Sequence, residues 1–200
     1  MRYYDSIYKN NGKFCGARPS KLLVKIRKSL QKNGEFLDLG CGQGKDSFYL
    51  SHQDFKVTAI DSSKVAINQI NYLIKKKRIT NFVATCQNIK KFIIQPKKFD
   101  IIASLNALQF LAKKDSLNVI KKIKKAIAPQ GFIILASFTN ENPSSKRRRS
   151  YFKLGEMKKI FPKSRFKILH YFEGIIKDGG HIGMLQLHNH GIVEIIARKK

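Results

Sequence analysis

Short runs of apolar residues alternate along the chain with amphipathic stretches, and turn residues separate the two kinds of segment. This alternation is typical of βαβ units built around a mostly parallel sheet. The predicted strands are Glu35–Leu39, Lys56–Ile60, Phe82–Cys86, Phe99–Ala103, Phe132–Ser137, Phe166–Phe172 and Gly191–Arg198. The predicted helices are Pro19–Gln31, Lys45–His52, Ser63–Lys77, Asp115–Ala128 and Leu154–Phe161.

Local chemistry supports several of these boundaries. Asp61 or Ser62 is placed to cap the helix that begins near Ser63, and Pro129-Gln130-Gly131 is expected to end the helix before the fifth strand. The last two strands follow one another without a full crossover helix, which a parallel pair would need. We therefore predict an α/β fold with a seven-stranded, mostly parallel sheet, an antiparallel last strand and helices on both faces.

The length and composition fit one domain of ordinary size, because 200 residues can bury a substantial core. The longest apolar stretches are too short to cross a bilayer, and the amino terminus lacks the apolar core of a signal peptide. We expect a cytoplasmic protein without membrane association. The three cysteines, Cys15, Cys41 and Cys86, lack metal-ligand spacing, so we expect free thiols and no metal site.

The formal net charge of +27 is the most unusual bulk property. Such an excess favours a nucleic-acid partner, because cations neutralise phosphates. However, 31 of the 40 cations are lysines, and they recur in every segment, as in Lys75–Lys77 and Lys121–Lys125. A lysine-rich composition would give the same pattern, and arginine is the better bidentate phosphate ligand. Both interpretations of the charge stay open.

The strongest local signal is a loop with three alternating glycines, Gly40, Gly42 and Gly44, between a buried-looking strand and a helix. Glycine removes the side chain where backbone must approach a ligand, and it permits positive φ in a tight turn. The loop would lie at the carboxyl end of the first strand, where open α/β sheets bind ligands.

Two acidic residues and one lysine indicate which ligand this loop holds. Lys45 stands where the dinucleotide fingerprint GxGxxG requires glycine. Asp38 precedes the loop, where a carboxylate suits the ammonium group of an amino-acid cofactor such as S-adenosylmethionine (SAM) better than a pyrophosphate. Asp61 ends the second strand 23 residues later and can accept hydrogen bonds from both hydroxyls of a ribose. The alternative is that both carboxylates only cap turns.

The stretch DLGCGQG resembles the first motif of the class I SAM-dependent methyltransferases, and the resemblance extends over nearly the whole chain. It implies a Rossmann-like SAM methyltransferase fold, SAM as the cofactor and S-adenosylhomocysteine as the product. The residues that this motif would place around the methionine half of SAM are Asp38, Gly40, Cys41, Gly42 and Gly44. Asp61 and its neighbour Ser62 would lie at the ribose.

Two further segments resemble motifs of the same family. Cys86-Gln87-Asn88-Ile89 is similar to the segment that holds adenine, with Asn88 where the family often has aspartate; an amide can still accept and donate hydrogen bonds there. The stretch from Phe99 to Leu111 is similar to the fourth-strand motif, which places Leu105 at the cofactor. Gln109 stands where many relatives have histidine.

Within this class, the chain resembles the tellurite-resistance (TehB-like) methyltransferases, which methylate small oxyanions or other small nucleophiles. This resemblance rests on the first motif, on the segment GEMKKIF and on the carboxyl-terminal ending. It implies methyl transfer to a small molecule, for example tellurite, selenite or a thiol. Two alternatives are an RNA or DNA methyltransferase that uses Lys146–Arg149 and the basic surface, and a non-catalytic protein that binds SAM or nucleic acid.

Three residues are candidates for the acceptor side of the site. His188 and His190 would share one face of an extended strand, with His181 upstream, and could act as proton acceptors or anion binders. Arg18 would suit an anionic substrate within a lid that also holds Tyr3, Tyr4 and Tyr8. Ordinary strand-edge hydrogen bonds and a solvated surface cation are the alternatives. We thus expect a helical lid in residues 1–33, a SAM-binding half in 34–137 and an acceptor-side half in 138–200.

Overall fold

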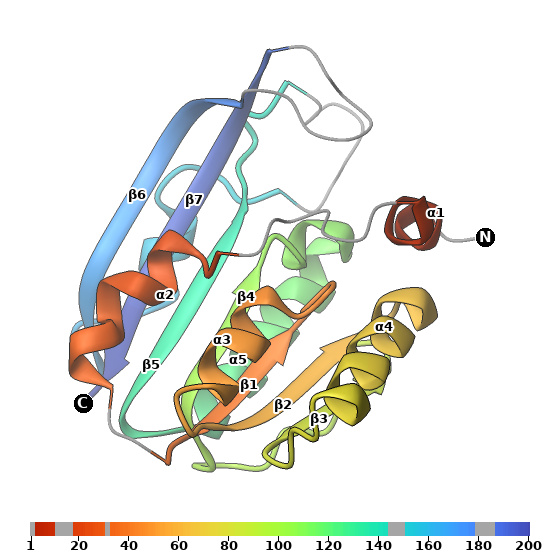
Figure 1. Ribbon diagram of the computed structural model, residues 1–200. Coiled ribbons are helices and arrows are strands. Elements are labelled where there is room, and N and C mark those ends of the chain that lie inside the picture. Colours follow the sequence, from red (N-terminus) through yellow and green to blue (C-terminus); the bar gives the residue numbers. More distant parts are fainter. Residues whose placement is uncertain (1–2, 11–17, 31–32, 144–150, 179–186) are drawn as a thin grey trace.

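The computed structural model describes residues 3–10, 18–30, 33–143, 151–178 and 187–200 (Figure 1). Its strands are β1 Glu35–Leu39, β2 Lys56–Asp61, β3 Phe82–Cys86, β4 Phe99–Leu105, β5 Ile127–Phe138, β6 Phe166–Asp178 and β7 His188–Lys199. Its α-helices are α1 Tyr3–Asn10, α2 Lys21–Ile26, α3 Lys45–Ser51, α4 Lys64–Lys76, α5 Lys113–Ala126 and α6 Glu156–Lys159. Two 3₁₀ turns, η1 Arg27–Ser29 and η2 Leu108–Phe110, complete these elements.

The seven strands form one sheet in the order β3-β2-β1-β4-β5-β7-β6. The first five strands pair in parallel, whereas β7 runs antiparallel to β5 on one side and to β6 on the other. This topology confirms the predicted fold class, including the antiparallel last strand.

Helices cover both faces of the sheet, so the central strands are apolar on both sides. In β4, Ile101 packs toward α2, α3 and α4, while its neighbour Ile102 packs toward α5 on the other face. Both side chains are fully buried, as are Ile133 and Ile134 in β5. Because successive side chains of a strand point to opposite faces, these pairs contribute to two separate core layers. Figure 1 shows α5 behind the sheet and α2 and α3 in front of it.

Several boundaries differ from the sequence prediction for local reasons. The predicted helix 19–31 is divided into α2 and the short η1. Ser20 caps α2 by accepting from the N–H of Leu23, so the helix begins after this residue. Ser63, and neither Asp61 nor Ser62, caps α4 by accepting from Ala66 N–H.

The Pro129–Gly131 turn also differs, since it lies within the residues assigned to β5 and does not end the helix before it. Helix α5 stops earlier, at Ala126. The backbone N–H groups of Lys97 and Lys98 donate to the carbonyls of Lys125 and Ala126, so the loop before β4 satisfies the end of this helix.

Strands β6 and β7 are longer than predicted, because they pair with each other from Phe166↔Lys199 to Asp178↔His188. Helix α1 was not predicted as a separate element. No helix within the described ranges combines the length and the apolar character needed to span a membrane.

Gly191 in β7 lies where the β6–β7 pair packs closely against the segment that follows β5. A Cβ atom at Gly191 would lie 2.5 Å from Asn142 N and 2.7 Å from Glu141 C, both backbone atoms. We expect Gly191→Ala to lower the free energy of unfolding by about 1–3 kcal/mol, as overpacked sites do. Urea unfolding followed by circular dichroism measures this.

Gly174→Ala is the matched control, because Gly174 pairs with Ile192 in the neighbouring strand and its Cβ would meet only Phe172 Cζ at 3.6 Å. That variant should leave stability unchanged or raise it slightly, since alanine restricts the unfolded chain. Equal losses in both variants would contradict the packing argument.

Candidate functional site

The glycine loop lies at the carboxyl end of β1 and is fixed by neighbouring strands. Gly40, Gly42 and Gly44 all have positive φ, at 80°, 54° and 77°. The N–H groups of Gly40 and Cys41 donate to the carbonyl of Ile60 at the end of β2, at 2.7 and 3.1 Å. A Cβ atom at Gly40 would lie 2.2 Å from the Cβ of Ala107, which leaves no room for any side chain there. The loop therefore requires glycine at position 40, both for its positive φ and for the close approach of Ala107.

Asp38 is buried immediately before this loop, at 5% exposure. Its Oδ2 accepts a hydrogen bond from Ser47 Oγ at 2.7 Å. Burial, and next the nearby charge of Asp46, raises the pKa of Asp38 from 3.8 to about 7. Among the described residues, no lysine, arginine or histidine forms an ion pair with this carboxylate. A buried carboxylate without a cation suits a ligand that brings its own positive charge.

Asp61 lies at the end of β2 and holds two backbone groups. Its Oδ2 accepts from Gly42 N–H at 2.9 Å, and its Oδ1 accepts from Ser63 N–H at 2.8 Å. Burial raises the pKa of this carboxyl group. A carboxylate offers about four acceptor positions, so each oxygen retains capacity for a hydroxyl donor. Asp61 thus stabilises the turns, as expected if the carboxylates cap turns. It can also accept a hydrogen bond from a ligand.

A cavity of about 240 Å³ opens beside Asp61, at the carboxyl ends of β2 and β3. It is lined by Asp5, Ser62, Lys64, Cys86, Gln87 and Asn88. This volume is below the usual range for a whole ligand, so it fits one part of a larger molecule.

The two candidate residues after β3, Asn88 and Ile89, have different surroundings. Asn88 Oδ1 accepts from Lys90 N–H at 2.9 Å, so this side chain also stabilises the local turn. Ile89 is buried in the core layer on the α5 side and is not among the residues that line the cavity. Leu105, at the end of β4, packs against the opposite core layer.

Helix α1 covers the ends of three strands. The Tyr8 hydroxyl lies 2.9 Å from the position of a Cβ atom on Gly42, after β1. Ser63 Oγ, after β2, donates to the carboxylate of Asp5. The ring of Tyr4 packs edge-on against Phe110, after β4, with centroids 5.2 Å apart. In Figure 1, α1 lies beyond the starting end of α4. The two tyrosines at i and i+4 were a signal for this helix that the sequence prediction did not use.

His188 and His190 contact each other at the start of β7. Their Nε2 atoms are 2.8 Å apart, and the ring of His190 stacks on Phe138 with centroids 4.9 Å apart. Asn142 Nδ2 lies 3.1 Å from His190 Nδ1. An amide NH₂ only donates, so in neutral His190 the proton is on Nε2 and is donated to Nε2 of His188. One imidazole orients the other, and two protons cannot both occupy the space between the two Nε2 atoms.

A buried polar group connects this pair of histidines with the end of β4. Gln109 is 2% exposed, and its Oε1 accepts from Ser137 Oγ at 3.4 Å. Ser137 immediately precedes Phe138, on which His190 stacks. Buried Thr139 Oγ1 has no hydrogen-bond partner within the described part of the chain. Polar side chains therefore extend along the same edge of the sheet, from η2 to the start of β7.

Arg18 is not joined to either of these groups by a contact between described residues. Its side chain is exposed, two residues before Ser20, whose N–H donates to Asp46 Oδ1 at 2.6 Å. Arg18 is thus near the start of α3, on the Asp38 side of the site. His181 and the cations of Lys146–Arg149 lie outside the described residues.

Taken together, the sheet edge can hold a ligand with an ammonium group at Asp38 and hydroxyl groups at Asp61. The glycine loop gives close backbone approach between them, and the cavity beside Ser62 and Asn88 continues from Asp61. The bond from Gly42 N–H to Asp61 links the loop to the second carboxylate, so these parts form one site.

Comparisons with known proteins agree with this arrangement. The sequence model of the family described as "Tellurite resistance protein TehB" matches residues 19–179. A protein of Haemophilus influenzae named "Probable S-adenosyl-L-methionine-dependent methyltransferase TehB" is 33% identical over 109 residues, which are 54% of this chain and 37% of that protein. A "Cypemycin N-terminal methyltransferase" of a Streptomyces species is 27% identical over 101 residues, 50% of this chain and 40% of that protein.

Solved structures share the fold at low sequence identity. The crystal structure of TehB from Haemophilus influenzae superposes with a TM-score of 0.80 at 22% identity, covering 98% of this chain and 67% of that one. A putative sarcosine dimethylglycine methyltransferase from Galdieria sulphuraria superposes with a TM-score of 0.75 at 12% identity, covering 98% of both chains.

The matches to the named relatives cover only part of those proteins, since they span about two fifths of their length. The family match covers more of this chain, because it includes α2, the glycine loop, both acidic strand ends and all of β6. The chain belongs to the tellurite resistance protein TehB family.

Proposed function

We propose that this chain is a SAM-dependent methyltransferase that transfers a methyl group to a small-molecule nucleophile. The observation that carries the proposal is the buried Asp38 carboxylate, which forms no ion pair with the described residues, beside a glycine loop that is hydrogen-bonded to a second carboxylate. An amino-acid cofactor with an ammonium group and a ribose complements these groups. The name of the Haemophilus influenzae relative also supports SAM as the cofactor.

In this proposal, the ammonium group of SAM pairs with Asp38, and the ribose hydroxyls donate to Asp61 next to Ser62. The amide of Asn88 receives the adenine in the cavity beside Ser62. Backbone of the loop, together with Cys41 and Leu105, surrounds the remaining part of the cofactor, and Ile89 supports the adenine segment from the core. When bound, SAM supplies an electrophilic methyl group on a sulfonium, and in-line displacement leaves S-adenosylhomocysteine.

The residues of the chain mainly orient the acceptor and exclude water. Helix α1, within the proposed lid of residues 1–33, covers the loops after β1, β2 and β4 and shields the sheet edge. The acceptor side, within residues 138–200, contains His188 and His190. This pair can take up one proton at His190 Nδ1 if the Asn142 amide turns its oxygen toward that atom. Arg18 near α3 would attract an anionic acceptor.

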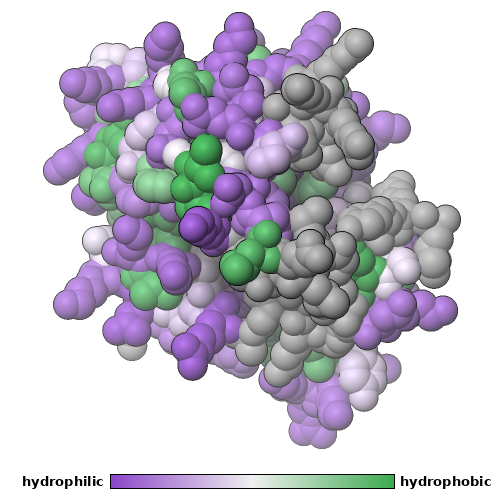
Figure 2. Space-filling view, turned by 90° about the horizontal axis from the view of Figure 1, so that it is seen from above, coloured by the Kyte–Doolittle hydropathy of each residue, from purple (hydrophilic) through white to green (hydrophobic). Residues whose placement is uncertain are grey.

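The family description names tellurite, so we propose a small oxyanion such as tellurite or selenite, or a thiol, as the acceptor class. A nucleic-acid methyltransferase is the second candidate, which the basic composition favours. Figure 2 views the molecule from above, onto the side where the parallel strands end, and shows hydrophilic residues spread over the described surface with small apolar groups between them. The lysines recur in every segment of the chain, so the charge is not a feature of this edge alone, and we favour the small acceptor.

The decisive experiment supplies the purified protein with SAM that carries a labelled methyl group. The acceptor panel contains tellurite, selenite, small thiols and total RNA, and binding of SAM is measured separately by calorimetry. We expect SAM binding and label in a small volatile or soluble product. Label in RNA alone would show that the acceptor is a nucleic acid and not a small molecule. No binding of SAM would refute the proposal as a whole.

Asp38→Asn tests the carboxylate that is proposed to pair with the ammonium group. The variant should bind SAM about ten- to a hundredfold more weakly, because a charge-assisted hydrogen bond is lost. Its stability without ligand should be equal or higher, since asparagine avoids the cost of a buried charge. Asp54→Asn, at an exposed position before β2, is the control and should bind SAM like the wild type.

The pH dependence of binding gives an independent test of the same residue. The raised pKa of Asp38, about 7, means that the carboxyl group gains its proton as the pH falls through neutrality. Only the ionised form pairs with an ammonium group, so the affinity of the wild type should fall from pH about 8 to about 6. Asp38→Asn should show no such decrease. A decrease of the same size in the variant would assign the titration to another group.

Substitution of the two histidines tests their role at the acceptor. We expect His188→Asn and His190→Asn to slow methyl transfer to an acceptor that must lose a proton, by about a hundredfold or more, without changing the affinity for SAM. Transfer to an acceptor that is already anionic should depend on them less. His52→Asn, at the exposed end of α3, serves as control. Equal rates in all three variants would show that the pair only supports β7.

A further inference from the structure

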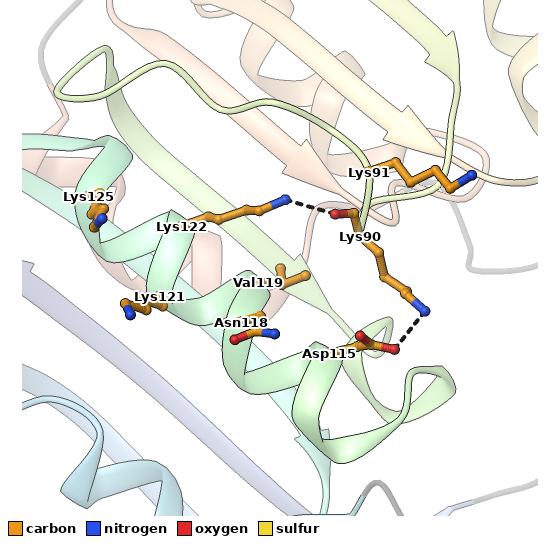
Figure 3. Close-up of a pocket in the computed structure, with 8 residues that line it drawn as sticks. All are labelled: Lys90, Lys91, Asp115, Asn118, Val119, Lys121, Lys122 and Lys125. Atoms are coloured by element: carbon orange, nitrogen blue, oxygen red, sulfur yellow. Dashed lines mark hydrogen bonds and ion pairs between the residues drawn. The ribbon is translucent and has the colours of Figure 1, made fainter.

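A second hollow, of about 410 Å³, lies on the face of the sheet that α5 covers, between α5 and the segment that connects β3 to β4 (Figure 3). Its lining residues are Lys90, Lys91, Asp115, Asn118, Val119, Lys121, Lys122 and Lys125. The segment after β3 contributes to both hollows, since Asn88 lines the smaller cavity and Lys90 lines this groove. The proposed methyltransferase function does not use the groove.

The cations of the groove exceed its anions, and two of them are fixed in place. Asp115 forms an ion pair with Lys90 at 2.6 Å, so the one carboxylate of the lining already has a partner. The ammonium group of Lys122 crosses the groove and donates to the carbonyls of Lys90 and Phe92, at 2.7 and 3.3 Å. Figure 3 shows both links between the walls. The walls are therefore held at a set distance, with positive charge on each side.

The positive charge continues from Lys90 and Lys91 toward the carboxyl-terminal half of α5. The connecting segment begins beside Asp115, near the start of this helix, and ends where Lys97 and Lys98 donate from their backbone to its last carbonyls. We call the exposed or groove-lining lysines of the connecting segment and of residues 121–125 in α5 the basic stripe: Lys90, Lys91, Lys97, Lys98, Lys121, Lys122 and Lys125. The stripe runs alongside residues 115–126 of α5, from the ion pair of Lys90 with Asp115 to the hydrogen bond of Lys98 with Ala126, over about 18 Å at 1.5 Å per residue.

This length and chemistry indicate what binds there. A nucleic-acid strand places one phosphate per 3.4 Å, so about five phosphates match the stripe, which is more than a single small anion provides. Lysine binds phosphate as a point charge. The lining contains no aromatic side chain on which a base could stack, so contacts would be to the backbone only.

We propose that the basic stripe along α5 binds the phosphate backbone of a nucleic acid without recognising its bases. An anion with several charges also relieves the repulsion between like charges such as Lys121 and Lys125, four residues apart on one helix face. The stripe lies apart from the glycine loop, so binding there does not require methyl transfer to the nucleic acid.

The test compares two triple variants that lose the same charge. Lys91→Gln, Lys121→Gln and Lys125→Gln together remove exposed lysines of the stripe while retaining the structural links of Lys90 and Lys122. Lys75→Gln, Lys76→Gln and Lys77→Gln together remove three exposed lysines at the end of α4. Fluorescence anisotropy with a labelled 20-base-pair DNA duplex, over a series of salt concentrations, measures affinity and its salt dependence.

For the wild type we expect affinity to fall steeply with salt, because bound counterions are released. The stripe variant should lose about tenfold or more in affinity at low salt, and its slope of log K against log salt should decrease by up to about three. The α4 variant should bind within about twofold of the wild type. Thermal unfolding and SAM binding of the stripe variant should be unchanged, which separates loss of binding from loss of structure.

Three results would overturn the proposal. Equal weakening by the two triple variants would mean that the charge acts diffusely over the surface. Failure of the wild type to bind the duplex at low salt would exclude a nucleic-acid partner. Binding of inorganic polyphosphate with no binding of the duplex would assign the stripe to a different polyanion.

Discussion

The parallel pairing of β1 with β2 on one side and β4 on the other positions every part of the candidate site. In this register Asp38 is opposite Ala59 and Ala103, so the strands reach the same edge of the sheet together. The chain leaves β1 through Gly40, whose N–H is held by the carbonyl of Ile60. Ala107 then packs where a side chain on Gly40 would lie. The glycine is thus required by the convergence of three strand ends.

The sequence pattern predicted this central part well, for a physical reason. Central parallel strands are buried on both faces, so they read as continuous apolar runs such as the one from Ile101 to Ala103. Because the ends of parallel strands meet at one edge, the proximity of Asp38 and Asp61 also follows from sequence order. The hydrogen bond from Gly42 N–H to Asp61 Oδ2 shows that the loop after β1 and the end of β2 are in contact.

Features that depend on contacts distant in sequence were harder to predict. Helix α1 has eight residues, too few to be stable alone, and it is held by Tyr4 and Asp5 against loops more than 50 residues away. Likewise, the spacing of His188 and His190 predicts a shared face. The proton positions depend on Asn142, which lies in the segment after β5. Only the folded chain brings these residues together.

The buried carboxyl group of Asp38 couples ligand binding to folding. Its pKa in the folded chain, about 7, is above its ordinary 3.8, so between these values the folded state holds more protons than the unfolded state. The stability of the chain without ligand therefore decreases as the pH rises through this interval. A bound ammonium group favours the ionised form and lowers the pKa again, which removes that cost. The same burial that weakens the empty fold at neutral pH thus increases the gain from a cationic ligand, since the ligand supplies a charge in direct contact with Asp38, which forms no ion pair with the described residues.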